Sequence, residues 1–106
     1  MAIHEIDDVE KNVKESDVTV IDFYGSNCPA CLSVQHLLEI VSEQLSDQVT
    51  FLKLNIDNHM DQAKKLGVRS LPTMVFFKGG EEVDRHIGLI SRNSLNKRIG
   101  KLLADE

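Results

Sequence analysis

Two cysteines, Cys28 and Cys31, stand in this 106-residue chain with only Pro29 and Ala30 between them, and the sequence has no others. Two thiols at this spacing are typical of reversible disulfide chemistry. A structural zinc site needs four ligands, and the sequence has no second cysteine pair. Buried cysteines can also be inert. The spacing therefore favours a redox-active dithiol, and no metal site is predicted.

The residues that flank the pair predict a strand before it and a helix after it. Val18–Tyr24 is mostly apolar and β-branched, which is typical of a strand buried on both faces. Residues 32–45 carry an apolar stripe at helical spacing. Pro29 suits the first helical position because its missing N–H costs nothing there. Cys28 is therefore expected to cap the helix.

The cap position makes Cys28 the expected nucleophile. The free N–H groups and the positive dipole end of a helix stabilise a thiolate. We expect the Cys28 sulfur to face the N–H groups of Ala30 and Cys31. Cys31 lies one turn further along and is the expected resolving thiol, more buried than Cys28.

The rest of the chain predicts strands and helices in the order βαβαβαββα. Runs of β-branched and aromatic residues indicate strands, and apolar residues three and four positions apart indicate helices. The remaining predicted elements are an edge strand over 2–6, a short helix from Asp7 or Asp8 to about Glu15, a strand over 49–56, a short helix capped by Asp57 or Asn58 and stopped by Gly67, strands over 73–78 and 81–87 joined by Gly79 and Gly80, and a last helix capped by Ser91. This order predicts an α/β fold with a central mixed sheet flanked by helices.

Composition and charge narrow the class of protein. With 106 residues, of which 42% are hydrophobic, the chain is predicted to be a single domain over 1–106. Its net charge of −5 argues against nucleic acid as a partner. No apolar run is long enough to span a bilayer, and the first residues lack the pattern of a signal peptide. The chain is therefore predicted to have no membrane partner. Because two cysteines make no structural disulfide framework, a cytoplasmic location is predicted.

Four stretches resemble the thioredoxin family and together cover nearly the whole chain. They are Asp22-Phe23-Tyr24 leading to Cys28-Pro29-Ala30-Cys31, Lys53-Leu54-Asn55-Ile56-Asp57, Leu71-Pro72-Thr73 after Gly67-Val68-Arg69, and Phe77-Lys78-Gly79-Gly80-Glu81 followed by Gly88. The resemblance implies a thioredoxin fold and a thiol–disulfide oxidoreductase that carries electrons on its own Cys28–Cys31 disulfide, without a cofactor. It also implies a cis peptide bond between Leu71 and Pro72.

Asp22 stands in the middle of an otherwise apolar strand. A carboxyl group in apolar surroundings has a raised pKa and can accept a proton near neutral pH. Asp22 is therefore the candidate base for the Cys31 thiol, and Lys53 would modulate it; the resemblance favours a buried Asp22. The alternatives are an Asp22 that faces solvent or pairs quietly with Lys53, and a Lys53 that is merely solvated.

Four residues are expected to form a substrate groove beside the dithiol. A cis bond before Pro72 would leave the backbone of Ser70 and Leu71 exposed, so that an extended substrate could add to it as a short strand. Gly88 would form the other side of the groove, because a side chain there would block the approach. An ordinary turn proline at Pro72 is the alternative.

The chain departs from the family where the family usually has Trp-Cys-Gly-Pro-Cys-Lys. Tyr24 and Asn27 stand where the family often has two tryptophans. Asn27 is expected to contact substrates, and the loss of an aromatic anchor there can cost about 2 kcal/mol of binding. We therefore expect recognition by a generic thioredoxin reductase to be impaired. Proline directly after Cys28 is closer to glutaredoxins and to disulfide-introducing relatives. Because Ala30 keeps an N–H that can face the Cys28 sulfur, we predict a more oxidising potential than that of the Gly-Pro form.

These features predict a cytoplasmic enzyme that reduces protein disulfides by dithiol exchange and serves cell redox homeostasis. Its expected partners are disulfide-containing protein substrates and a reductase, similar to thioredoxin reductase, as electron donor. The protein is expected to be a monomer. Two alternatives stay open. One is a glutaredoxin-like or disulfide-introducing oxidoreductase, and the other is a non-catalytic thioredoxin-fold binding module with an incidental dithiol.

Overall fold

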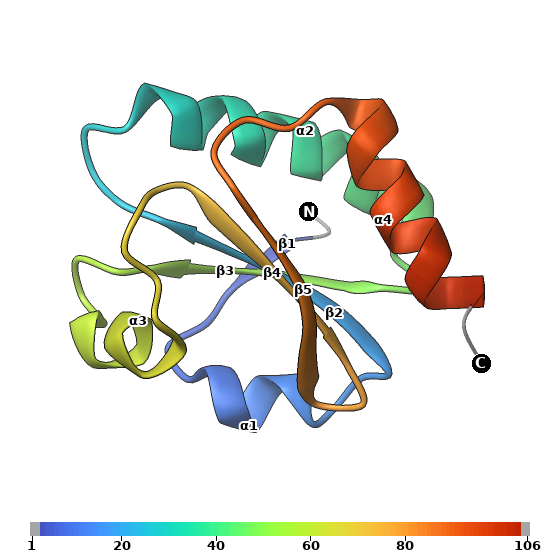
Figure 1. Ribbon diagram of the computed structural model, residues 1–106, viewed down its shortest axis with the longest axis horizontal. Helices are drawn as coiled ribbons and strands as arrows, with labels where there is room; N and C mark the ends of the chain where they lie inside the picture. Colours follow the sequence, from blue (N-terminus) through green and yellow to red (C-terminus); the bar gives the residue numbers. More distant parts are fainter. Residues whose placement is uncertain (1–2, 105–106) are drawn as a thin grey trace.

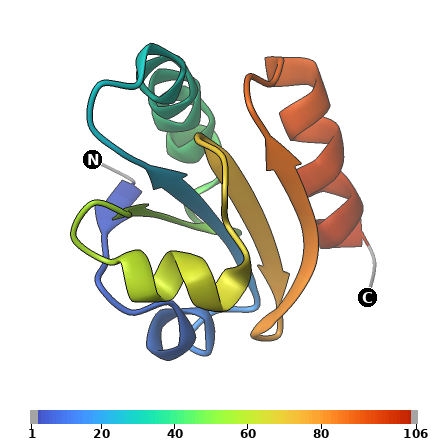
Figure 2. The ribbon, with the colours of Figure 1, turned by 60° about the vertical axis from the view of Figure 1, so that its left-hand side comes forward.

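The computed structural model describes residues 3–104 and shows a layer of strands between two layers of helices (Figure 1). Helices α2 and α4 cover one face of the sheet, and the shorter helices α1 and α3 lie together on the other face (Figure 2). Along the described chain, the elements are β1 (Ile3–Glu5), α1 (Val9–Val13), β2 (Val18–Tyr24), α2 (Pro29–Leu45), β3 (Thr50–Asn55), α3 (Met60–Leu66), β4 (Thr73–Lys78), β5 (Glu81–Ile87) and α4 (Arg92–Ala104).

The predicted order βαβαβαββα is confirmed, and only the ends of some elements differ. β4 and β5 have the predicted bounds. α1 ends at Val13 instead of near Glu15, whose N–H closes a turn onto the Asn12 carbonyl at 3.3 Å. β3 is one residue shorter at each end than the predicted strand over 49–56. Ala2, the first residue of the predicted edge strand, lies outside the described residues.

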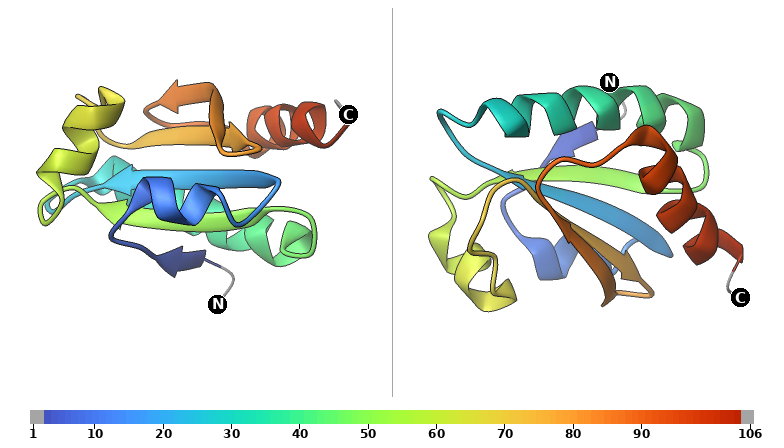
Figure 3. Two further views of the ribbon diagram at one scale, coloured as in Figure 1. Left: turned by 90° about the horizontal axis from the view of Figure 1, so that it is seen from below. Right: turned by 45° about the horizontal axis from the view of Figure 1, so that its top comes forward.

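The five strands of the described chain form one mixed sheet in the order β1-β3-β2-β4-β5, and the left view of Figure 3 shows the strands side by side. β1, β3 and β2 run parallel to one another, whereas β4 is antiparallel to both of its neighbours. Parallel neighbours need a crossover connection, and α2 supplies it between β2 and β3. β2 therefore lies in the centre of the sheet, and all but the last of its side chains are buried.

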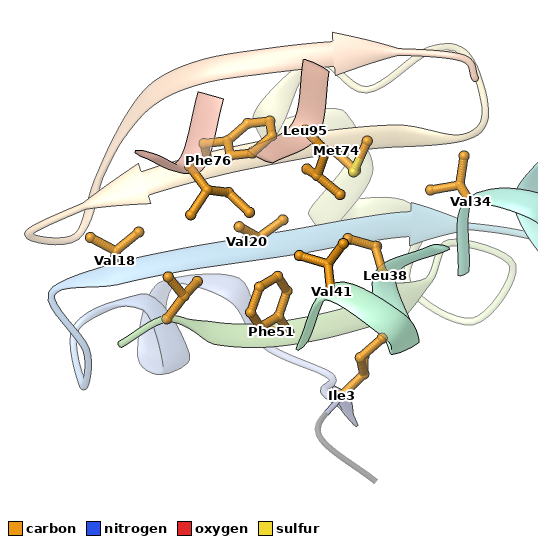
Figure 4. Packing of buried hydrophobic residues seen from close by; sticks show 12 residues of the cluster. Ile3, Val18, Val20, Val34, Leu38, Val41, Phe51, Met74, Phe76 and Leu95 are labelled. Atoms are coloured by element: carbon orange, nitrogen blue, oxygen red, sulfur yellow. The ribbon is translucent and has the colours of Figure 1, made fainter. Parts of the chain in front are cut away.

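Alternation along β2 divides its buried side chains between the two faces of the sheet. Val20 packs with Leu38 and Val41 of α2, in the cluster drawn in Figure 4. Ile21 belongs to the cluster on the opposite face, under α1 and α3. Asp22 follows the alternation and faces α2, two residues beyond Val20 toward the end of the strand. The fold thus places a carboxylate under the beginning of the helix that starts after Cys28.

The helices begin mostly where the sequence predicts. The Asp8 side chain caps α1, and the Ser91 hydroxyl accepts a backbone N–H in the first turn of α4. The predicted cap of α3 at Asp57 or Asn58 is wrong. α3 begins after His59 and has no side-chain cap, because the Asp57 carboxylate is directed to the loop before α2 instead. No helix within residues 3–104 has the length and apolar character needed to cross a membrane.

Candidate active site

Cys28 and Cys31 form a disulfide at the N-terminus of α2. Cys28 is the N-cap and Pro29 holds the first helical position, as predicted. The backbone N–H of Cys31 donates to the Cys28 Sγ at 3.2 Å, whereas the hydrogen bond predicted from Ala30 is not formed in the described chain. An N-cap acceptor commonly bonds the third N–H of its helix, which is that of Cys31. Cys28 is half-buried and Cys31 is 2% exposed, so the Cys28 sulfur is the more accessible one.

Gly25 is the point where three loops meet beside the dithiol. A Cβ on Gly25 would lie 2.9 Å from Leu71 Cδ1 and 3.4 Å from Asp57 Oδ1. Asp57 Oδ2 accepts the N–H of Ser26 at 2.9 Å. These contacts join the loops that lead into α2, α3 and β4, which lie at one end of the sheet in Figure 1. The absence of a side chain at Gly25 therefore lets the loop before β4 approach the cysteine loop closely.

The Leu71–Pro72 peptide bond is cis, as the resemblance implied. Pro72 is buried, and its carbonyl accepts the N–H of Gly88 at 2.8 Å. The Gly88 backbone has a φ of 90°, which favours glycine, and a Cβ there would enter open space. Ser70 is exposed, but its carbonyl accepts the Thr73 hydroxyl at 2.6 Å. The four predicted groove residues thus lie together, and their contact with a substrate stays a prediction.

Asp22 is fully buried, and neither of its carboxylate oxygens has a hydrogen-bond partner among the described residues. Burial raises the pKa of Asp22 to about 7. The positive charge of Lys53 opposes this rise, and the negative charge of Glu5 adds to it. The alternative in which Asp22 faces solvent is therefore wrong. Since Cys31 is buried at the start of α2, the helix that covers this face, thiol and carboxylate occupy the same side of the sheet.

Lys53 is the neighbour of Asp22 across the β2–β3 register. Its Nζ lies over the Tyr24 ring, 5.8 Å from the centroid, which is the arrangement of a cation–π contact. Within residues 3–104 no ion pair joins Lys53 to Asp22. The quiet ion pair considered for these two residues is therefore not formed, and Lys53 acts on Asp22 through space.

Tyr24, the last residue of β2, connects this strand to β1. Its hydroxyl donates to Glu5 Oε1. Partial burial, followed by the hydrogen bond to Glu5, raises the pKa of Tyr24 above its usual value, so that the phenol stays a donor. Sequence reasoning gave Glu5 no role, because the three-residue β1 is too short to show which of its side chains face the dithiol. The weak alternation of apolar and polar residues over 2–6 was the one sign in the sequence of which β1 side chains share a face.

Asn27 precedes Cys28 and has a left-handed backbone with a φ of 54°. Asparagine tolerates this conformation better than a large aromatic residue does. Asn27 lines an open pocket of about 600 Å³ beside the dithiol, together with Gln35 and Asn55. None of the described residues that line this pocket is charged. Nowhere in residues 3–104 do three or more His, Cys, Asp or Glu side chains gather so that they could hold a metal ion.

Known proteins are similar in sequence to this chain over most of its length. The family model described as Thioredoxin matches residues 2–101. The thioredoxin of Rickettsia conorii is 39% identical over 93 residues, which cover 87% of this chain and 89% of the relative. Thioredoxin 1 of Synechococcus elongatus is 34% identical over 95 residues, which cover 89% of each chain.

Solved structures share the fold. A mutant thioredoxin of Halobacterium salinarum superposes with a TM-score of 0.88 at 26% identity, covering 95% of this chain and 90% of the other. The thioredoxin of Malassezia sympodialis superposes with a TM-score of 0.84 at 30% identity and the same coverage. The predicted α/β fold with its central mixed sheet is confirmed.

Proposed function

The chain belongs to the thioredoxin family, and on that basis we propose that Cys28 is its nucleophile, Cys31 its resolving thiol and Asp22 its proton acceptor. Membership of the family makes it a thiol–disulfide oxidoreductase that reduces protein disulfides. One observation carries the assignment of roles. Cys28 is accessible at a helix N-terminus, whereas Cys31 is buried on the sheet face that also buries Asp22.

In the first step, the Cys28 thiolate attacks one sulfur of a substrate disulfide. A mixed disulfide between Cys28 and the substrate forms, the substrate S–S bond breaks, and the other substrate sulfur leaves as a thiolate. The N-terminus of α2 favours the Cys28 thiolate through its dipole and its free N–H groups. The Cys31 N–H, which lies 3.2 Å from the Cys28 Sγ, is one such donor.

In the second step, Asp22 accepts the proton of the Cys31 thiol, and the new thiolate attacks Cys28. The mixed disulfide breaks, the second substrate sulfur leaves as a thiolate, and the Cys28–Cys31 disulfide forms. The substrate disulfide gains two electrons, and the protein dithiol loses two. A carboxylate with a pKa of about 7 suits this step, because it is a stronger base than an ordinary aspartate yet is partly ionised at neutral pH. Lys53 would modulate that balance.

We assign the substrate groove to Ser70, Leu71, Pro72 and Gly88, with Asn27 at its edge near Cys28. Two observations support the groove: the hydrogen bond between Gly88 and Pro72, and the open space beside Gly88. Because the Ser70 carbonyl is engaged within its own loop, the backbone of Leu71 is the better candidate to pair with an extended substrate.

A protein disulfide suits the site better than glutathione does. Glutathione carries carboxylates, and among the described residues that line the pocket beside Cys28 none is charged. The amide side chains of Asn27, Gln35 and Asn55 instead match the peptide groups of a protein substrate. This contrast supports protein-disulfide reduction over the glutaredoxin-like alternative.

The remaining assignments concern partners and setting. Members of this family are generally reduced by thioredoxin reductase, and we assign a reductase of this kind as the electron donor. The Cys28–Cys31 dithiol is then the whole redox centre, and no cofactor takes part. Use of both cysteines as a reversible pair fits a reducing compartment. We assign the protein as a monomer of one domain that works in the cytoplasm.

Single-turnover reduction of a protein disulfide by the reduced protein tests these assignments. Cys28→Ser should abolish the reaction. Asp22→Asn should slow it by on the order of 100-fold at pH 7, the lower end for loss of a general base. Asp61→Asn, which neutralises an exposed acid on α3, is the matched control and should react like the wild type. Reduction retained in Cys28→Ser would contradict Cys28 as the nucleophile, whereas no reduction by the wild type would contradict the enzyme and favour the binding module.

A further inference from the structure

A row of charged side chains crosses the sheet at the level of Asp22. Glu5 on β1 is paired in register with Lys53 on β3, and Lys53 is paired with Asp22 on β2. Side chains of directly paired residues lie on the same face of a sheet. One ammonium group therefore stands between two carboxylates, of which Glu5 is exposed and Asp22 is fully buried.

Tyr24 contacts two members of this row, and among the described residues no ion pair joins Lys53 to Glu5 or to Asp22. The Tyr24 hydroxyl donates to the Glu5 carboxylate, and the Tyr24 ring lies under the Lys53 ammonium. A single aromatic residue thus holds both the carboxylate of β1 and the ammonium of β3. Asp22 has no hydrogen-bond partner among the described residues. An unpaired ionised carboxylate in the interior is costly, so any approach of Lys53 would favour the ionised form of Asp22.

We propose that Glu5 competes with Asp22 for Lys53 and thereby governs the ability of Asp22 to take a proton. Tyr24 anchors Glu5 for this role. Glu5 is a positioning residue, because it touches neither the substrate nor a reacting sulfur. Its effect on disulfide exchange rests on the proposed function of Asp22 as the proton acceptor.

An ionised Glu5 acts on Asp22 in two ways. Its own negative charge, two strand spacings or about 10 Å away, disfavours a second negative charge in the interior. It also attracts the Lys53 ammonium, whose positive charge would otherwise stabilise only the Asp22 carboxylate. The strands place Lys53, Glu5 and Tyr24 on the same face as Asp22, and α2, which covers that face, contributes the buried Cys31. The β4 neighbour of Asp22 is the uncharged Met74.

The test is the titration of the Asp22 side-chain carboxyl, followed by carbon-13 NMR in the full-length disulfide form. Glu5→Gln should move the Asp22 midpoint to lower pH by about half a pH unit. Tyr24→Phe should move it in the same direction by less, because the Glu5 charge remains but loses its anchor. Glu10→Gln removes an exposed carboxylate on α1, on the other face of the sheet, and should leave the midpoint unchanged.

Repeating the substitution in a Lys53→Met background separates competition from direct repulsion. Competition predicts a clearly smaller effect of Glu5→Gln without Lys53, since only the direct repulsion is left. An effect of equal size in both backgrounds would overturn the proposal. So would a Glu5→Gln midpoint identical to that of the wild type.

A kinetic measurement separates this proposal from the proposed function. The release of a substrate from its mixed disulfide with Cys28 is followed against pH. If Asp22 accepts the proton of Cys31, Glu5→Gln shifts the release profile together with the NMR midpoint. A shifted midpoint with an unshifted release profile would support the competition for Lys53 and contradict only the role of Asp22 as proton acceptor.

Discussion

Asp22 is a buried carboxyl group whose ionisation opposes folding. Its pKa is about 7 in the folded protein against an ordinary value of 3.8, so between these values the folded state binds a proton that the unfolded state lacks. Stability therefore falls as the pH rises from about 4 to about 7, and the penalty is largest above that range. The sign follows from desolvation, which penalises the charged form.

Asp22→Asn should remove this penalty. We expect the free energy of unfolding to rise by on the order of 4 kcal/mol at pH 8, because folding raises the pKa from 3.8 to about 7 and each tenfold change in proton affinity corresponds to about 1.4 kcal/mol. The gain should shrink at pH 5, where the folded protein already holds the proton. Urea unfolding at both pH values measures it, with Asp61→Asn as the exposed control. A gain of equal size at both pH values would contradict the buried, unpaired carboxylate.

Ala30 contributes a backbone N–H to the first turn of α2. In the described chain, the disulfide form uses only the Cys31 N–H at the Cys28 sulfur, but a thiolate is a stronger acceptor. Ala30→Pro removes the second donor, and proline is tolerated in the first turn. We expect the potential to become more reducing by about 30 mV, which is about 1.4 kcal/mol for this couple.

Equilibration in glutathione buffers with thiol trapping measures that potential. Ser33→Ala, on an exposed position of the same helix, is the control and should leave the potential unchanged. An Ala30→Pro potential equal to the wild type, or more oxidising, would show that the Ala30 N–H does not stabilise the thiolate.

Asp22 and Asn27 show how far single residues could be predicted from the sequence. The apolar neighbours of Asp22 along its strand indicated burial, and the structure confirms it. The left-handed backbone of Asn27 could not be predicted. It depends on how the cysteine loop closes onto Asp57 and Leu71, and these residues come from other parts of the chain.

At the level of elements, two glycines with open space around them should respond in opposite ways. Gly100 lies inside α4, and Gly67 ends α3 with a left-handed φ of 68°. Gly100→Ala should stabilise the protein by about 1 kcal/mol, because alanine is the better helix former. Gly67→Ala should destabilise it by about 1 kcal/mol, because an L side chain disfavours that backbone.

Thermal or urea unfolding of both variants measures the difference, and each serves as the control for the other. Equal changes in stability would contradict the assignment of Gly67 as a left-handed helix end.

The long elements could be predicted from periodicity, and the short helices only in part. α2 carries enough apolar turns to define its face, and β4 and β5 have the bounds that their sequence predicts. α1 and α3 are fixed instead by contacts between distant residues. The N–H of Val9 donates to Gln62 Oε1 at 3.0 Å, and the Asp57 carboxylate binds the Ser26 N–H. No local pattern reveals such partners, and the cap predicted for α3 was therefore wrong.

For the whole molecule, the covering of both sheet faces predicts cooperative unfolding. β2 contributes side chains to both buried clusters, so neither layer of helices can separate without exposing it. We expect one transition in urea, with the same midpoint by circular dichroism and by fluorescence of Tyr24, the sole tyrosine in a chain without tryptophan. Separate midpoints would contradict a single domain over 1–106.

The sheet register joins residues that are far apart in the sequence, and this limits prediction of the site. Lys53 lies between Glu5 and Asp22 only because β3 pairs with both β1 and β2. The dithiol and its helix could be predicted from adjacent residues. The charged row beneath them depends on strand order, which the spacing of residues along the chain does not specify.

The most direct measurement is the identity of the cysteine that attacks a substrate. Cys31→Ser is mixed with a protein disulfide, and the covalent product is mapped by mass spectrometry of its peptides. We predict a stable mixed disulfide through Cys28, released by dithiothreitol, and little product with Cys28→Ser because Cys31 is 2% exposed. A mixed disulfide that forms equally fast through Cys31, or none at all with Cys31→Ser, would contradict dithiol exchange led by Cys28.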